Sequence, residues 1–194
     1  MRTLIIDTAT SRTSVGLFEG NSPLFAGRMD GATSHGQALP QLVSAALEIG
    51  KPISQVVIGM GPGPFTGLRV GIAFAQVFAE ARKIPLLGIS SLDGIVSGVT
   101  GKYIVATDAR RREIYWAEFD SGKRTSEPRV SQPNFVKDLG LPVYGEGAQL
   151  YGFEADIDMT HPNPLLLLSA LESGQRVDRP MYLRKPDALT LEER

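Results

Sequence analysis

The sequence predicts an α/β fold of mixed sheets and crossover helices, arranged in two lobes of which the second is reduced. One observation is the β-branched run 56–58, which is followed by a loop of glycine and proline and then by a helical segment from Gly67 to Arg82. The other is a repeated plan, in which a strand ends in an aspartate and a polar turn leads to a second strand, at 4–18 and again at 103–119. Strands that alternate with helices are typical of this fold class.

The composition limits the classes of function. The chain has 194 residues, of which 42% are hydrophobic, so it can bury a substantial core. Its net charge of −1 argues against tight, independent binding to nucleic acid or to a membrane. The absence of cysteine excludes disulfides and cysteine-ligated zinc. With neither an apolar leader nor a stretch long enough to span a bilayer, the sequence predicts a cytoplasmic protein.

Strands are predicted from short apolar runs that end at turn residues. A hydroxyl-rich turn beginning at Asp7 joins strands at 4–6 and 13–18, and residues 24–29 form a third strand after a further turn. Residues 85–89 form another strand after the long helix.

The first helix is predicted to begin near His35. Ser34 precedes it as a cap, and Gln37 stands where a capping box needs its second member. An apolar stripe follows, and Gly50 and Pro52 end the helix. The stripe consists of Leu39, Leu42, Val43, Ala46 and Ile49.

The loop at 59–67 stands where nucleotide-binding proteins place a phosphate cradle. It lacks the lysine of a Walker loop, and its glycines are not spaced as in the dinucleotide fingerprint. Pro62 and Pro64 have no N–H group to offer an anion. We therefore interpret it as a rigid structural turn, although the phosphate site stays an alternative. Its defining residues are Gly61, Gly63, Phe65, Thr66 and Gly67.

The helix from Gly67 to Arg82 is apolar on nearly all sides. Such a helix either lies at the centre of a core or is partly covered by a protein partner, and the pattern alone favours neither alternative. Small residues on one side would allow another helix to approach closely. The three faces are Gly67, Gly71 and Ala75; Ala73, Val77 and Ala81; and Val70, Phe74 and Phe78.

The two lobes are predicted to divide near residue 100. A short helix capped by Ser90 or Ser91 ends the first lobe, and the polar stretch 97–102 is the best candidate for a boundary. We accordingly assign residues 1–100 to an N-terminal lobe with the dimerisation helices and 101–194 to a smaller C-terminal lobe.

A duplicated sheet of this kind suggests the fold shared by actin, sugar kinases and heat-shock ATPases. In that fold the turn of each hairpin faces a nucleotide between the lobes. This makes Asp7, Thr8, Asp108 and Arg110 candidate nucleotide-facing residues. Both aspartates could hold magnesium through water, but we favour a simpler role in forming the turns.

The second half of the chain contains shorter elements. Residues 134–139 are predicted to be helical and 143–144 to form a short strand. Asn163 is predicted to cap a helix with Pro164 at its first position, which ends at Gly174.

Chemical groups for catalysis are sparse. His35 and His161 are far apart and have no second ligand at helical spacing, so a metal site is not predicted. Without a suitably placed histidine, a serine nucleophile would have no obvious base. His35 is interpreted as a surface or capping residue. The arginines at 110–112 could contact phosphate or RNA, although such a run is usually a solvated loop.

Several segments together resemble the TsaB (YeaZ) family. They are 6–10 (IDTAT), 61–71 (GPGPFTGLRVG), 108–110 (DAR), 113–117 (EIYWA) and 182–184 (YLR). These segments lie in both halves of the chain, and the glycine-loop motif is specific. One departure is Pro64, where the family usually has serine, and this proline stiffens the turn.

The resemblance implies a noncatalytic scaffold and activator subunit without a cofactor of its own. It would bind a TsaD-type paralogue and a TsaE-type ATPase, which would carry the ATP and metal. The TsaD-type enzyme transfers a threonylcarbamoyl group to the adenosine next to the anticodon of tRNAs reading ANN codons, so this chain would meet tRNA only through the complex. The paralogue has a His-x-x-x-His metal site where this chain has Ser91 and Ile95, which cannot bind the metal.

The resemblance also implies that the two helices form the interface with the paralogue, or with a second copy when the chain is alone. The expected contact residues are His35, Leu39, Leu42, Val43, Ala46, Leu68, Gly71, Ile72, Ala75 and Phe78. The alternative from another class is an independent actin-like ATPase or an M22-type metallopeptidase-like enzyme. A third is a regulatory adaptor unrelated to tRNA.

Overall fold

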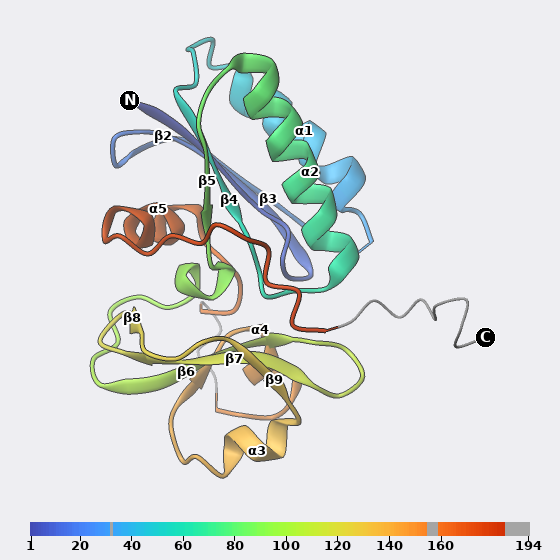
Figure 1. Cartoon of the computed structure of the whole chain (residues 1–194), viewed down its shortest axis with the longest axis vertical. Helices are drawn as coiled ribbons and strands as arrows, with labels where there is room; N and C mark the ends of the chain where they lie inside the picture. Colours follow the sequence, from blue (N-terminus) through green and yellow to red (C-terminus); the bar gives the residue numbers. More distant parts are fainter. Residues whose placement is uncertain (32, 155–158, 185–194) are drawn as a thin grey trace, which may run out of the picture.

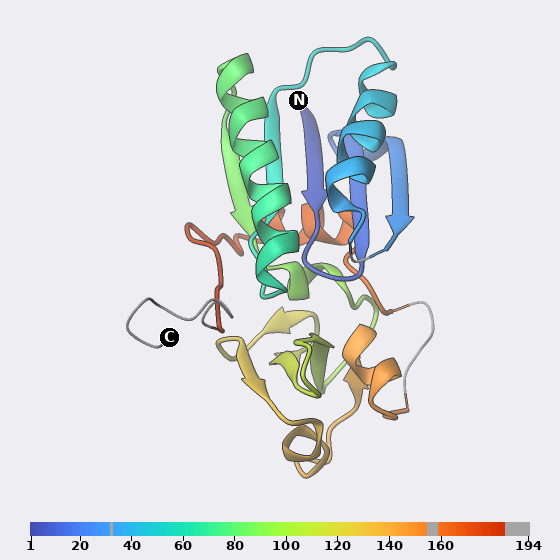
Figure 2. The ribbon, with the colours of Figure 1, turned by 90° about the vertical axis from the view of Figure 1, so that its right-hand side faces the viewer.

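Two five-stranded sheets form the two lobes of the computed structural model (Figures 1 and 2). The structure describes residues 1–31, 33–154 and 159–184. The first sheet has the order β3-β2-β1-β4-β5, and the second has the order β10-β6-β7-β8 with β9 paired to β7. Within the described residues no helix is long and apolar enough to cross a membrane.

In the first lobe, two helices cover one face of the sheet, as Figure 1 shows. The strands β1 and β2 and the strands β2 and β3 pair antiparallel, whereas β4 runs parallel to both β1 and β5. The elements are β1 (Arg2–Asp7), β2 (Arg12–Glu19), β3 (Ser22–Asp30), α1 (His35–Leu47), β4 (Gln55–Gly59), α2 (Phe65–Arg82) and β5 (Leu86–Ile89).

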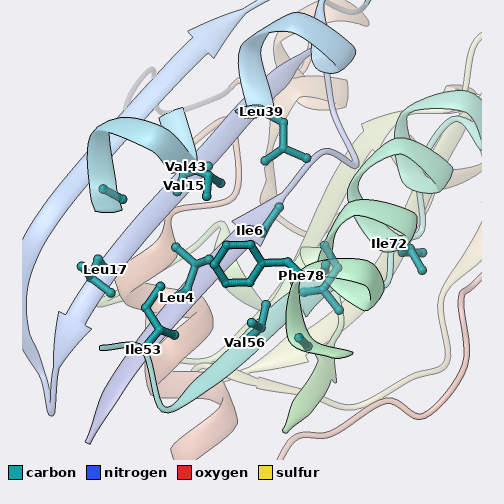
Figure 3. Packing of buried hydrophobic residues seen from close by; sticks show 14 of the residues in the cluster. Leu4, Ile6, Val15, Leu17, Leu39, Val43, Ile53, Val56, Ile72 and Phe78 are labelled. Carbon is teal, nitrogen blue, oxygen red and sulfur yellow. The ribbon is translucent and has the colours of Figure 1, made fainter. Parts of the chain in front are cut away.

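The core of this lobe lies between the sheet and the two helices (Figure 3). Leu39 and Val43 of α1 and Phe78 of α2 point toward the strands, where they meet side chains such as Leu4 and Val56. Burial of these side chains gives α1 and α2 their fixed positions on the sheet.

The other face of the first sheet is covered by α5 (Pro164–Glu172). Leu167 packs there against the side chains of Ile5, Val57 and Ile89. The chain thus returns to the first sheet after residue 160, which differs from the expected assignment of all of 101–194 to the second lobe. The start of α5 is as predicted, because the side chain of Asn163 accepts a hydrogen bond from Leu165 N at 2.9 Å.

The second lobe repeats the topology of the first on a smaller scale. As β1 pairs antiparallel with β2 and parallel with β4, so β6 pairs antiparallel with β7 and parallel with β10. The elements are η1 (Ser91–Gly94) before the lobe, then β6 (Lys102–Asp108), β7 (Ile114–Asp120), β8 (Lys123–Arg124), β9 (Arg129–Ser131), α3 (Pro133–Lys137), β10 (Val143–Tyr144) and α4 (Glu146–Leu150).

Alternation along β6 divides its side chains between two cores. Ile104 and Ala106 pack with Trp116 in the core beside α3 and α4. Tyr103 and Val105 pack instead with the cluster that contains Leu92 of η1. The cluster that contains Leu92, Tyr103 and Val105 therefore joins the second lobe to η1 at the end of the first lobe.

One predicted helix start and one predicted helix cap differ from the structure. Helix α2 begins at Phe65, earlier than the expected Gly67. The capping box of α1 is absent, because Ser34 has nearly helical dihedral angles (φ −97°, ψ 0°) and its hydroxyl turns back to donate to Gly31 O at 2.7 Å.

Helix α5 should be essential for the stability of the first lobe. Leu167→Ala removes a fully buried side chain and should lower the free energy of unfolding by about 2–5 kcal/mol. The matched control is Leu165→Ala in the same helix, where the side chain is 44% exposed and the change should stay within about 0.5 kcal/mol. Urea denaturation followed by circular dichroism measures both. Equal effects would contradict the packing of α5 on the sheet.

Candidate functional site at the lobe junction

The glycine loop and the first turns of α2 pack against the turn between β1 and β2. A Cβ atom added at Gly63 would overlap Ala9 O, and one added at Gly71 would overlap Thr8 Oγ1. The Thr8 hydroxyl donates to Gly67 O at 2.7 Å. The small-residue face of α2 is therefore used inside the chain, where it admits the β1–β2 turn.

The residues expected at the partner interface are mostly inside the chain's own core. Only Leu42 among them is partly exposed. The others are buried because the apolar sides of α1 and α2 face the sheet: His35, Leu39, Val43, Ala46, Leu68, Gly71, Ile72, Ala75 and Phe78. In this conformation they offer a partner no surface. The outward residues of the two helices are the ones that remain accessible.

Asp7 is buried at the end of β1 and is held by hydrogen bonds from two sides. Ala9 N donates to Oδ1 at 2.9 Å, and Ser91 Oγ donates to Oδ2 at 2.5 Å. Burial raises the pKa of Asp7 to about 6, although these hydrogen bonds act in the opposite direction. Ser91 also accepts a hydrogen bond from Gly61 N at 3.2 Å, so Asp7 links β1, the glycine loop and η1.

A pocket of about 340 Å³ lies where the two hairpin turns approach each other. The structure thus brings Thr8 and Arg110, two of the candidate nucleotide-facing residues, to one cavity, whereas Asp7 is enclosed by its own chain. The lining consists of Thr8, Thr10, Thr33, His35, Gly36, Pro64, Thr66, Gly67, Val70 and Arg110.

His35 in this pocket is not the surface residue that the sequence suggested. Its Nδ1 lies 2.8 Å from Thr13 Oγ1, and the side chain is buried between α1 and β2. Burial lowers the pKa of His35, so the ring is neutral at physiological pH. A neutral ring adds no positive charge for a phosphate.

The turn between β6 and β7 carries the three consecutive arginines. Asp108 Oδ1 accepts hydrogen bonds from Arg110 N at 2.9 Å and from Tyr151 OH at 3.1 Å, so this aspartate forms the turn as expected. Residues Arg110, Arg111 and Arg112 have φ angles of 60°, 52° and 61°. For side chains other than glycine, such angles cost about 1 kcal/mol or more per residue.

The segment 175–184 connects the two lobes outside the pocket. Val177 N donates to Gly88 O at 3.0 Å, and Met181 N donates to Met60 O at 2.8 Å. At its end Arg184 donates to Ala109 O at 2.8 Å and forms an ion pair with Glu113. Sequence analysis assigned no structural role to the motif at 182–184. Its function as a bridge depends on contacts with residues that lie far earlier in the chain.

A polar cluster elsewhere at the junction between the lobes was also not predicted from the sequence. The Ser11 hydroxyl donates to the Glu146 carboxylate and lies 3.1 Å from His161 Nε2, while His161 Nδ1 lies 2.8 Å from Thr160 Oγ1. We call these four residues the Ser11 cluster. Burial would raise the pKa of Glu146, but hydrogen bonds from His161 and Ser11 together hold it below its ordinary value.

The Ser11 cluster has the composition of a nucleophile with a base, but its hydrogen bonds point to another role. Because the Ser11 hydroxyl donates to Glu146, its proton is not directed toward His161. The cluster joins the β1–β2 turn to the start of α4 in the other lobe. Among the described residues no group of three histidines or acidic side chains could hold a metal ion.

The two sheets of related topology and the junction between them define a two-lobed α/β protein with mixed sheets and crossover helices, as predicted. Residues 29–176 match the family model described as TsaD, tRNA N6-adenosine threonylcarbamoyltransferase. The chain is 33% identical to the tRNA threonylcarbamoyladenosine biosynthesis protein TsaB of Escherichia coli, over 86% of this chain and 78% of that protein. The chain belongs to the TsaB (YeaZ) family.

Further relatives cover nearly the whole chain. An uncharacterized protein of Mycobacterium tuberculosis is 38% identical over 97% of this chain and 94% of its own length. The solved structure of YeaZ from Pseudomonas aeruginosa superposes with a TM-score of 0.73 at 25% identity, over 94% of this chain and 100% of that chain. A second structure, described as similar to peptidase YeaZ from Pseudomonas aeruginosa, has a TM-score of 0.77 at 26% identity, over 94% and 99%.

The buried Asp7 should make stability depend on pH. Its folded pKa of about 6 lies above the ordinary 3.8, so the folded state binds the proton more tightly than the unfolded state. The resulting stabilisation is complete below about pH 4 and is lost as the pH rises through about 6, by up to about 3 kcal/mol.

The variant Asp7→Asn should remove this part of the pH dependence. The free energy of unfolding of the wild type, relative to the variant, should fall by about 2–3 kcal/mol between pH 4 and pH 7 in urea titrations. The control Glu127→Gln changes an exposed acid and should show no such trend. A difference between wild type and Asp7→Asn that stays constant with pH would contradict a buried ionisable group.

Proposed function

We propose that this chain is a noncatalytic scaffold and activator subunit in the synthesis of threonylcarbamoyladenosine in tRNA. It binds a TsaD-type paralogue, which transfers the threonylcarbamoyl group to the adenosine next to the anticodon of tRNAs reading ANN codons, and it also engages a TsaE-type ATPase. Membership of the TsaB family supports the pathway. The observation that supports the role of scaffold is the outward face of α2.

The outward face of α2 has an apolar stripe of small side chains. Ala73, Val77 and Ala81 are exposed at four-residue spacing, and Val77 is 69% exposed. The neighbouring outward residues of α1 include Gly36, Pro40 and Ser44, which are also small. Small side chains let a second pair of helices approach closely. The same face would pair two copies of the chain when the paralogue is absent.

The residues that stand in place of the paralogue's metal ligands support a noncatalytic role. Ser91 is hydrogen-bonded to Asp7, and Ile95 is buried in the core that joins the lobes. Both positions therefore serve the packing of this chain. We infer that the chain has no cofactor of its own and that ATP and metal belong to the partners.

A charge on the outward face of α2 should prevent assembly. Val77→Glu places a carboxylate in the centre of the proposed interface and should abolish co-purification with the TsaD-type paralogue, while the far-UV circular dichroism spectrum of the isolated chain stays that of the folded wild type. The matched control is Leu150→Glu, which changes a side chain that is 58% exposed on α4 in the other lobe and should assemble normally. Normal assembly of Val77→Glu would exclude this face.

The chain alone should form no modified nucleoside. With threonylcarbamoyl-adenylate and an unmodified tRNA, mass spectrometry of digested nucleosides should detect threonylcarbamoyladenosine only when the TsaD-type paralogue is present, and more of it when this chain is added. Transfer by the isolated chain would refute the noncatalytic role. Turnover of ATP by the isolated chain would favour an independent actin-like ATPase.

A further inference from the structure

The arginines at 110–112 are held in a left-handed backbone conformation, which costs free energy for any residue other than glycine. All three are exposed and have positive φ angles, which glycine adopts without strain. The turn keeps this shape because Asp108 binds Arg110 N, Glu113 N donates to Arg110 O at 3.0 Å, and Arg184 binds Ala109 O. The turn therefore presents three exposed cationic side chains together at the end of the β6–β7 hairpin, in a backbone conformation whose cost suggests a function for them.

Aromatic side chains and a further arginine lie beside this turn. The ring of Tyr182, which is 42% exposed, lies 5.1 Å from the ring of Phe65, and the guanidinium of Arg69 lies 4.5 Å above Phe65. Two residues after Tyr182, Arg184 reaches the β6–β7 turn. Figure 1 shows the end of this hairpin and the first turn of α2 on the same side of the molecule, and Arg110 shares a pocket with Thr66.

We call these residues the arginine surface, and we propose that it contacts the phosphate backbone of tRNA within the assembled complex. It consists of Phe65, Arg69, Arg110, Arg111, Arg112, Tyr182 and Arg184. The inference rests on the proposed function, because a chain with a net charge of −1 would bind RNA weakly by itself.

The chemistry of the arginine surface favours RNA over a protein partner. Among the described residues, two carboxylates beside it are paired with arginines, Asp108 with Arg110 at 3.2 Å and Glu113 with Arg184. Guanidinium groups bind phosphate oxygens with paired hydrogen bonds, and an exposed ring such as Tyr182 can stack on an unpaired base. The turn also lies in the second lobe, apart from the face of α2 proposed for the protein partner.

The test measures tRNA binding by the complex of this chain with the TsaD-type paralogue and the TsaE-type ATPase. The variant Arg110→Gln/Arg111→Gln/Arg112→Gln should bind an unmodified tRNA that reads an ANN codon about ten-fold or more weakly, and the slope of log affinity against log salt should decrease by about 1–2. The control Lys123→Gln/Arg176→Gln removes exposed charges near the opposite end of β7. It should change neither the affinity for tRNA nor the salt slope.

The outcomes separate this inference from the proposed function. A variant complex that assembles normally and binds tRNA with unchanged affinity and salt slope would overturn the inference alone. A variant that no longer binds the paralogue would show that the arginine surface is a protein contact, and would overturn it as well. A wild-type chain that does not assemble with the paralogue would refute the proposed function and, with it, the inference.

A second variant distinguishes binding from a structural role of the turn. Arg112→Gly relieves a positive φ angle and removes one guanidinium. We expect an unchanged or higher melting temperature together with several-fold weaker tRNA binding by the complex. A lower melting temperature with unchanged tRNA binding would show that the side chain serves only the fold, and would overturn the inference.

Discussion

The buried carboxyl group of Asp7 is the constraint on which the arrangement of the first lobe depends. Its oxygens accept hydrogen bonds from Ala9 and Ser91, so that β1, its turn and η1 meet at one group. The position of that turn in turn determines how closely α2 can approach, because Gly71 packs against Thr8. Burying this group is costly, and the hydrogen bonds around it offset part of the cost while they define a single geometry. The same group that places the helices on the sheet is thereby enclosed by its own chain.

Within residues 1–31, 33–154 and 159–184, contacts at three places join the two lobes: the core around η1, the Ser11 cluster, and the segment that runs from β5 to the β6–β7 turn and ends at Arg184. Enzymes that close around a substrate rely on a hinge that bends with little resistance. These three sets of contacts between the lobes oppose such bending here. A fixed angle between lobes is of greater use to a subunit that presents surfaces to partners than to one that encloses a ligand, and this agrees with the proposed scaffold.

The sequence predicted much of the fold because strands, caps and turns are local signals. The cap by Asn163, the short strand at 143–144 and the repeated hairpin all depend on neighbouring residues. The site was harder to predict, since its contacts join distant segments. Periodicity showed that α2 is apolar on nearly all sides, but it did not show that the face with Gly71 packs on a turn that lies far earlier in the chain, so most of the residues expected at the interface are buried inside the chain. The return of α5 to the first sheet and the Ser11 cluster had no local signal at all.

The position of α5 has a consequence for how the chain is made. In the part of the chain that the structure describes, the face of the first sheet that contains Ile5 and Val57 packs against α5, a helix near the other end of the sequence. During translation this apolar face emerges from the ribosome long before its cover does, so the N-terminal half cannot complete its fold while synthesis continues. Fragments that end before residue 164 would expose this face and be prone to aggregation. The two lobes are thus distinct in architecture but form one cooperative unit in biosynthesis.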